Sequence, residues 1–239
     1  EAAPNPPAPS GAVAGDAITL EKADFAWGAA EGAAEGAAPV AVLKNVSLRV
    51  PRGQLVMVVG TVGSGKSSLL AGLLGELVCS HGGCTVAGSR AFTAQEPWIQ
   101  NATVRQNIVA GAPFEEEKYR RVIEACALGS DLELLPAGDE SEIGEKGINL
   151  SGGQRHRVAL ARAMYAAADV YLLDDPLSAV DAHVGKHLFE RCICGALAGT
   201  TRVLVTHQTQ FAESADFIYV LEDGMVAHAG TYSELQAQG

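Results

Sequence analysis

The sequence predicts an α/β fold, and the distribution of its apolar runs carries this prediction. Short, largely apolar stretches recur at residues 54–59, 170–173 and 202–206. Strands that are buried on both faces of a parallel sheet have this pattern. Stretches of helical character separate the three runs, as expected when crossover helices join parallel strands. In such a fold the loops that carry chemistry lie at the carboxyl ends of the strands.

The first part of the chain adds a linker, a strand and a helical region. Residues 1–15, rich in Pro and Ala, predict a flexible linker. Residues 18–27 alternate loosely between apolar and polar side chains, as a strand does. Between about residues 99 and 158 the pattern favours helix. One apolar face at helical spacing, which we expect in the core, is formed by Tyr119, Val122, Ile123 and Cys126.

The C-terminal part predicts a hairpin and a closing helix. Two apolar stretches, 217–221 and 225–229, flank the turn sequence Glu222-Asp223-Gly224. Thr231 and Glu234 have the spacing of a capping box at the start of a helix.

Length, charge and cysteine content limit the class of protein. The 239 residues, 48% of them hydrophobic, suffice for one large domain. The formal net charge of −11 opposes nucleic-acid binding, which depends on Lys and Arg. No apolar run approaches the roughly 18 residues that span a bilayer, and the first residues do not resemble a signal peptide. We therefore expect membrane association only through other chains or other parts of a longer polypeptide. Five irregularly spaced cysteines predict reduced thiols rather than a disulfide framework.

A phosphate-binding loop follows the first predicted buried strand and precedes a helical run. Its glycines let backbone N–H groups converge on phosphate oxygens, and the helix N-terminus adds partial positive charge. We expect Lys66 to bridge the β- and γ-phosphates of a nucleotide and the Ser67 hydroxyl to bind Mg²⁺. The candidate binding residues are Gly60, Thr61, Val62, Gly63, Ser64, Gly65, Lys66, Ser67 and Ser68.

An acidic residue ends the second predicted buried strand. Asp174 directly follows the apolar tetrad at 170–173. A carboxylate that emerges beside a phosphate loop holds Mg²⁺ directly or through water. An apolar tetrad before an aspartate is weak evidence by itself. Together with the phosphate loop, it predicts the Walker B position of a nucleoside triphosphatase.

The sequence LSGGQ at residues 150–154 is the most specific motif of the chain. Together with the phosphate loop, it resembles the nucleotide-binding domain of ATP-binding-cassette (ABC) proteins. The resemblance covers residues 16–239 and implies a RecA-like P-loop NTPase core with an antiparallel β subdomain. It also implies an inserted α-helical subdomain at about residues 99–158, with ATP and Mg²⁺ as cofactors. Closer similarity to the first nucleotide-binding domain of subfamily C, the multidrug-resistance-associated proteins and their relatives, lies in AQEPWIQNATVRQNI, EIGEKGINLSGGQ and DPLSAVDAHVGKH.

Four residues take their roles from this resemblance. Trp27 lies where ABC domains place the aromatic ring that stacks on adenine, with a core tryptophan as the alternative. Gln95 matches the Q-loop glutamine, which reaches Mg²⁺ at the junction with the helical subdomain. His207 matches the switch histidine that contacts the γ-phosphate, and Asp181 matches the D-loop aspartate that faces the partner domain. The other five histidines match no such position, and we assign them no chemistry.

The resemblance also implies a partner. Ser151, Gly152, Gly153 and Gln154 would form an anion site at a helix N-terminus, which in this family meets the γ-phosphate held by the opposing domain. ATP would thus drive dimerisation with a second nucleotide-binding domain of the same polypeptide. Closure would move transmembrane domains that contact the Q-loop and the helical subdomain, which places this chain at the cytosolic face of a membrane.

Asp175 departs from the family pattern. The residue after the Walker B aspartate is usually a glutamate that polarises the attacking water. The aspartate side chain is shorter by one methylene, roughly 1.5 Å, and general-base catalysis depends on such distances. We therefore expect the catalytic set of Asp175, His207 and Gln95 to bind nucleotide but to hydrolyse it slowly.

Two alternatives to an exporter stay open. The same cassette occurs in subfamily C proteins that are channels or channel regulators, and substrate choice lies in absent transmembrane segments. A soluble ABC ATPase acting on DNA or ribosomes is the other alternative. It is opposed by the acidic charge and by the lack of coiled-coil heptads between Lys66 and Leu150.

Overall fold

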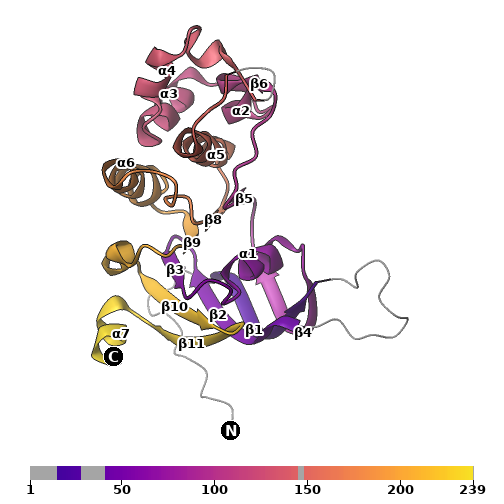
Figure 1. The fold of residues 1–239 in the computed structure, drawn as a ribbon. Coiled ribbons are helices and arrows are strands. Elements are labelled where there is room, and N and C mark those ends of the chain that lie inside the picture. Colours follow the sequence, from indigo (N-terminus) through magenta and orange to yellow (C-terminus); the bar gives the residue numbers. More distant parts are fainter. Residues whose placement is uncertain (1–14, 28–40, 145–147, 239) are drawn as a thin grey trace. The chain divides into compact units, whose positions relative to one another are not determined.

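The computed structural model describes residues 15–27, 41–144 and 148–238. These residues form two compact units (Figure 1). Unit 1 comprises the chain up to Arg90 together with Thr201 onward, and unit 2 comprises Ala91–Thr200. The predicted linker lies outside the described residues, except for Gly15. Among the described residues, no helix combines the length and apolarity needed to cross a membrane.

Unit 1 contains an antiparallel sheet and a mainly parallel sheet. The antiparallel sheet has the order β2-β1-β4, and the strands of the second sheet that belong to this unit have the order β11-β10-β3-β9. Strand β3 is parallel to both of its neighbours, whereas β10 and β11 are antiparallel. The elements are β1 (Asp16–Ala26), β2 (Ala41–Pro51), β3 (Leu55–Val59), α1 (Lys66–Leu74), β4 (Val78–Val86), β9 (Thr201–Val205), η3 (Thr209–Ser214), β10 (Phe217–Glu222), β11 (Met225–Gly230) and α7 (Tyr232–Gln238).

The predicted strands, hairpin and closing helix of unit 1 are confirmed. Glu222 pairs with Met225 across the turn of the β10–β11 hairpin. The backbone of Gly224 in this turn donates to Ser64 O (3.0 Å) and accepts from Lys44 N (2.9 Å). The hairpin therefore supports the phosphate loop from one side. Before α7, Glu234 Oε2 accepts from Thr231 N at 2.8 Å, and Thr231 Oγ1 accepts from Glu234 N at 3.4 Å, which is the predicted capping box.

Unit 2 is mainly helical. Two of its strands, β5 and β8, are neighbours in a sheet, and the short strands β6 and β7 form an antiparallel pair. The helices α2 to α4 lie within the region for which the sequence predicts helix, and α5 begins in that region and extends beyond it to Ala166. The elements are β5 (Arg90–Thr93), β6 (Ala102–Thr103), α2 (Val104–Val109), α3 (Glu116–Ala125), α4 (Gly129–Leu134), η1 (Gly138–Glu140), β7 (Glu142–Ile143), α5 (Gly152–Ala166), β8 (Val170–Asp174), α6 (Ala182–His187) and the π-helical segment η2 (Leu188–Ala196).

The core of unit 2 forms around helix α5. Tyr165 is fully buried, and its hydroxyl donates to Pro113 O (2.7 Å) and accepts from Glu115 N (2.8 Å). This pair of hydrogen bonds fixes the start of α3 against α5. Of the predicted apolar face of α3, Tyr119 and Val122 are buried, as is Cys126 after the helix, whereas Ile123 is half-buried. All five cysteines lie in the described part of the chain, and none of them forms a disulfide.

Candidate nucleotide-binding site

The phosphate loop connects β3 to α1 in unit 1, as the motif requires. Gly60, which follows β3, has a φ of +155°, and a Cβ atom there would lie 2.3 Å from Leu221 O. Only glycine fits this position, because the backbone of β10 passes directly against it. Gly65, the N-cap residue of α1, is also left-handed and provides no side-chain cap. The first N–H groups of α1 are therefore not capped by a side chain of the N-cap residue.

The side chains of the loop fit a bound phosphate. Lys66 is buried, and its Nζ donates to Gly60 O (2.9 Å) and Thr61 O (2.8 Å), which holds the ammonium group over the loop. Ser64 Oγ is buried and has no hydrogen-bond partner among the described residues. A buried, unsatisfied hydroxyl is costly unless a ligand or water completes it. Ser67 is exposed, as a ligand for Mg²⁺ must be before the ion binds.

Asp174 and Asp175 lie at the end of β8 in unit 2. All five residues of β8 are buried, and both aspartates are less than one-tenth exposed. Asp175 is left-handed, with a φ of +46°. Its carbonyl oxygen accepts from Ser178 N (3.2 Å) and Ser178 Oγ (2.8 Å), which closes a turn directly after the strand. The turn fixes the backbone from which the Asp175 carboxylate projects.

The LSGGQ motif starts helix α5 with a complete capping box. Ser151 Oγ accepts from Gln154 N at 3.2 Å, and Gln154 Oε1 accepts from Ser151 N at 2.8 Å. Gln154 Nε2 also donates to Asp131 Oδ1 (2.9 Å), and Asp131 forms an ion pair with Arg157. The motif is therefore held in one conformation by groups within unit 2. The Ser151 hydroxyl accepts in this box and keeps its proton for a further acceptor.

His156, to which the sequence assigned no chemistry, joins the LSGGQ helix to Gln95. Its Nδ1 lies 2.9 Å from Gly152 O, and its Nε2 lies 3.0 Å from Gln95 O. Both partners are carbonyl acceptors, so both contacts are hydrogen bonds only when the ring carries two protons. The imidazole thus positions the backbone of Gln95, the predicted Q-loop residue, whose own side chain is exposed. No local signal in the sequence predicts this contact, since Gln95 and His156 are 61 positions apart.

A polar pair, the buried Asn107 and the half-buried Arg162, fixes the segment that follows Gln95. Asn107, fully buried on α2, accepts from Gln100 N (2.9 Å) and donates to Gln100 O (3.0 Å). Arg162 on α5 donates to Asn107 O (2.7 Å) and to Trp98 O (2.9 Å). Burial lowers the pKa of Arg162 from its usual value. Sequence reasoning missed both residues, whose partners are set by packing.

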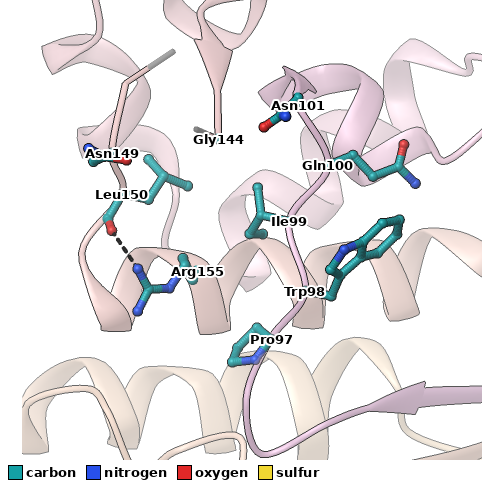
Figure 2. Close-up of a pocket in the computed structure, with 9 residues that line it drawn as sticks. All are labelled: Pro97, Trp98, Ile99, Gln100, Asn101, Gly144, Asn149, Leu150 and Arg155. Atoms are coloured by element: carbon teal, nitrogen blue, oxygen red, sulfur yellow. Dashed lines mark hydrogen bonds between the residues drawn. The ribbon is translucent and has the colours of Figure 1, made fainter. Parts of the chain in front are cut away.

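This segment lines an open pocket of about 720 Å³ within unit 2 (Figure 2). Pro97–Asn101 line one side of the pocket, and Asn149, Leu150 and Arg155 line the opposite side. Arg155 Nη1 donates to Leu150 O at 3.2 Å, and Trp98 is 67% exposed. A large exposed aromatic side chain beside a pocket is typical of a protein contact surface.

The remaining predicted residues have the following places. Trp27 directly follows β1 in unit 1 and is 54% exposed, so the alternative of a core tryptophan is wrong. His207 is exposed two residues after the end of β9. Asp181 is the N-cap of α6, and its Oδ1 accepts from His183 N (3.0 Å) and Val184 N (2.9 Å). These hydrogen bonds, that of Val184 above all, lower the pKa of Asp181.

The predicted site residues are thus divided between the units. Trp27, His207 and the phosphate loop lie in unit 1, and all the others lie in unit 2. Unit 2 brings Gln95 and the LSGGQ helix together through His156. The predicted Mg²⁺ ligands Ser67, Gln95 and Asp174 come from both units, so their convergence on one ion stays a prediction.

A phosphate loop after a parallel strand, a buried acidic strand end and a capped LSGGQ helix define a P-loop nucleotide-binding domain. The model of the ABC transporter family matches residues 43–178, which is more than half of the chain. The chain belongs to this family.

The similar curated proteins are members of subfamily C. ATP-binding cassette sub-family C member 2 of Mus musculus is 57% identical over 197 residues, which cover 82% of this chain and 13% of that protein. Sub-family C member 3 of Rattus norvegicus is 51% identical over 223 residues, which cover 92% of this chain and 14% of that protein. ABC transporter C family member 7 of Arabidopsis thaliana is 49% identical over 202 residues, which cover 84% of this chain and 14% of that protein. The chain therefore spans about one-seventh of the length of these relatives.

Proposed function

We propose that this chain is the first of two nucleotide-binding domains of a subfamily C exporter, and that its own ATP site turns over slowly. The observation that carries the proposal is the combination of an intact LSGGQ motif with Asp175 at the position of the family's usual glutamate. The two halves of the domain would then serve different ATP sites. The phosphate loop would hold a long-lived nucleotide, and LSGGQ would complete the hydrolytic site of the partner.

In this proposal each residue acts on the nucleotide by position and charge. Lys66, which is held over the loop by two carbonyl groups, would exchange them for phosphate oxygens of higher negative charge. Ser67, Gln95 and Asp174 would hold Mg²⁺, which supplies neutralising charge to the phosphates. Trp27 is sufficiently exposed to stack on adenine. His207 would contact the γ-phosphate, and Asp181 would face the partner domain.

Asp175 would limit the hydrolytic step. Its backbone is fixed by the two hydrogen bonds from Ser178, so the main chain cannot easily move to compensate for the missing methylene. A carboxylate about 1.5 Å short of its water loses general-base efficiency. Nucleotide affinity depends on the loop rather than on this residue and would be retained.

The contact with transmembrane domains would use the pocket beside Trp98. The pocket joins the segment after Gln95 to Leu150, the first residue of LSGGQ. A helix end seated there would touch both motifs at once. The exposed indole supports this role, because tryptophan combines a large apolar surface with a polar N–H group.

The slow-site proposal is tested by nucleotide binding to the 239-residue chain and by turnover in the full-length transporter. The chain should bind Mg·ATP and hydrolyse it poorly, and Asp175→Glu should raise turnover of the full-length protein by about tenfold or more, since a well-placed general base contributes roughly 100-fold or more. Asp169→Glu, an exposed position before β8, is the matched control and should leave turnover unchanged. Brisk hydrolysis by the unmodified chain would contradict the proposal.

The exporter setting is tested separately by transport in membranes. Full-length protein in inside-out vesicles should take up substrate only with hydrolysable nucleotide. Trp98→Ala should lower the rate of uptake by a larger factor than it lowers the affinity for nucleotide. A nucleotide-dependent current without uptake would favour the channel setting. Binding of DNA at physiological salt would favour the soluble alternative, which the similarity to subfamily C members opposes.

A further inference from the structure

Three sulfur atoms from three separate elements meet inside unit 2. Cys126 directly follows α3, Cys192 lies in the π-helical segment η2, and Met164 lies on α5. Cys126 Sγ is 4.0 Å from Cys192 Sγ, and Cys192 Sγ is 3.9 Å from Met164 Sδ. Both thiols are fully buried. None of the three side chains takes part in the nucleotide site.

The spacing of these atoms suits a soft metal ion. With metal–sulfur bonds of about 2.3 Å, three sulfur atoms around one ion in a plane are about 4.0 Å apart. Both sulfur–sulfur distances given above agree with this value. Two cysteines and a thioether are the ligands that select Cu(I). We propose that Cys126, Cys192 and Met164 form a binding site for a single Cu(I) ion.

The site has an entry path. Met164 is half-buried and lines a pocket of about 340 Å³, together with residues from α3 and from the end of η2. An ion that enters this pocket meets the thioether first and then Cys192, its neighbour at 3.9 Å. The two thiols bind as thiolates and release their protons to solvent, so the loaded site carries one net negative charge. Lys118 and Arg121 line the same pocket and supply compensating positive charge.

Zinc fits the site poorly. Structural zinc takes four ligands in a tetrahedron, and among the described residues no group of three His, Cys, Asp or Glu side chains is placed to hold a metal. The third ligand of the proposed site is a thioether, which zinc rarely uses and Cu(I) readily accepts. Selectivity for Cu(I) over Zn²⁺ is therefore part of the proposal.

The proposal is tested by anaerobic titration of the chain with Cu(I) against a chromogenic Cu(I) chelator. The protein carries Cys79→Ser, Cys84→Ser and Cys194→Ser, so that only the buried pair of thiols remains. We expect one ion bound per chain and no comparable binding of Zn²⁺. Cys126→Ala or Cys192→Ala should weaken binding by at least about 100-fold, since changes beyond the ligands of a metal already cost 10–100-fold.

Two further variants keep the test decisive if a buried cysteine variant fails to fold. Met164→Leu conserves volume and should weaken Cu(I) binding by about tenfold or more. Met225→Leu, on the exposed strand β11, is the matched control and should leave binding unchanged. X-ray absorption of the loaded protein should show sulfur atoms at about 2.3 Å from the ion. Absent binding, or equal affinity in the Met164→Leu variant and its control, would overturn the proposal and leave the three sulfur atoms as ordinary core packing.

Discussion

Helix α1 in unit 1 and helix α5 in unit 2 both begin at candidate phosphate-binding motifs, but their first turns are capped differently. The N-cap of α1 is Gly65, which has no side chain to accept from the backbone. The N-cap of α5 is Ser151, whose hydroxyl is engaged with Gln154 in a capping box. The N-cap residue of α1 therefore leaves the first backbone N–H groups of that helix to other partners, such as a ligand. The N-cap residue of α5 instead binds a backbone N–H group of its own helix.

This difference matches the roles proposed for the two motifs. A loop that encloses its own nucleotide can gain free energy by using N–H groups that its N-cap residue does not bind. A motif that waits for a nucleotide held by another domain must keep its shape without a ligand. The ion pair of Asp131 with Arg157 and the bond from Gln154 to Asp131 serve this purpose.

The largest expected effect is the loss of nucleotide affinity when the phosphate loop at the start of α1 is changed. Lys66→Ala should weaken Mg·ATP binding to the isolated chain by about 100-fold, since hydrogen bonds to a charged group contribute roughly 1.5–3 kcal/mol. Lys44→Ala, at an exposed position of β2, is the control. Equilibrium titration with a fluorescent ATP analogue measures both. Equal affinity for nucleotide in the two variants would contradict the assignment of this loop as the nucleotide-binding loop.

A second test compares two glycines of the LSGGQ motif by stability. A Cβ atom at Gly153 would lie 2.9 Å from Ala179 O, whereas one at Gly152 would lie 3.8 Å from Ala179 Cβ. Gly153→Ala should lower the free energy of unfolding by about 1–3 kcal/mol through overpacking. Gly152→Ala should be neutral or slightly stabilising, because alanine favours helix. Urea unfolding followed by circular dichroism distinguishes them, and equal losses would contradict the close approach.

Removing the cap of α5 should have a smaller effect that is confined to one motif. Ser151→Ala should cost about 1 kcal/mol of stability, the usual value for an N-cap residue. It should leave the Mg·ATP affinity of the isolated chain unchanged, because in our proposal the chain's own nucleotide binds at helix α1. Urea unfolding and the nucleotide titration test the two halves of this prediction. A loss of affinity in the isolated chain would mean that the motifs are not separate.

The smallest effect concerns Asp181 and pH. Its folded pKa lies below the usual value, so its cap stabilises α6 above the unfolded pKa and is lost as the pH falls through the lower folded pKa. Asp181→Asn should therefore reduce the difference in stability between neutral pH and strongly acid pH. Asp223→Asn, at an exposed turn position outside any helix cap, should not. Unfolding curves over this pH range measure the change, and parallel profiles would exclude a cap.

The sequence by itself determined the parts of this protein whose signals are local. The phosphate loop, the buried strands β3, β8 and β9, the β10–β11 hairpin and the capping box before α7 are each encoded within one short stretch of sequence. Their spacing, apolarity and turn chemistry specify them with little help from the rest of the chain. The motifs LSGGQ and Asp174 are of the same kind.

Only the tertiary structure decided the contacts between distant residues. The bridge from His156 to Gln95, the network of Asn107 with Arg162 and the cluster around Cys192 join residues that are 28 to 66 positions apart. No periodicity or short motif marks such pairs, because their partners are set by how helices pack. The tertiary structure also decided that Trp27 is exposed. Its residue type alone does not, because a tryptophan side chain can lie in a core or on a surface.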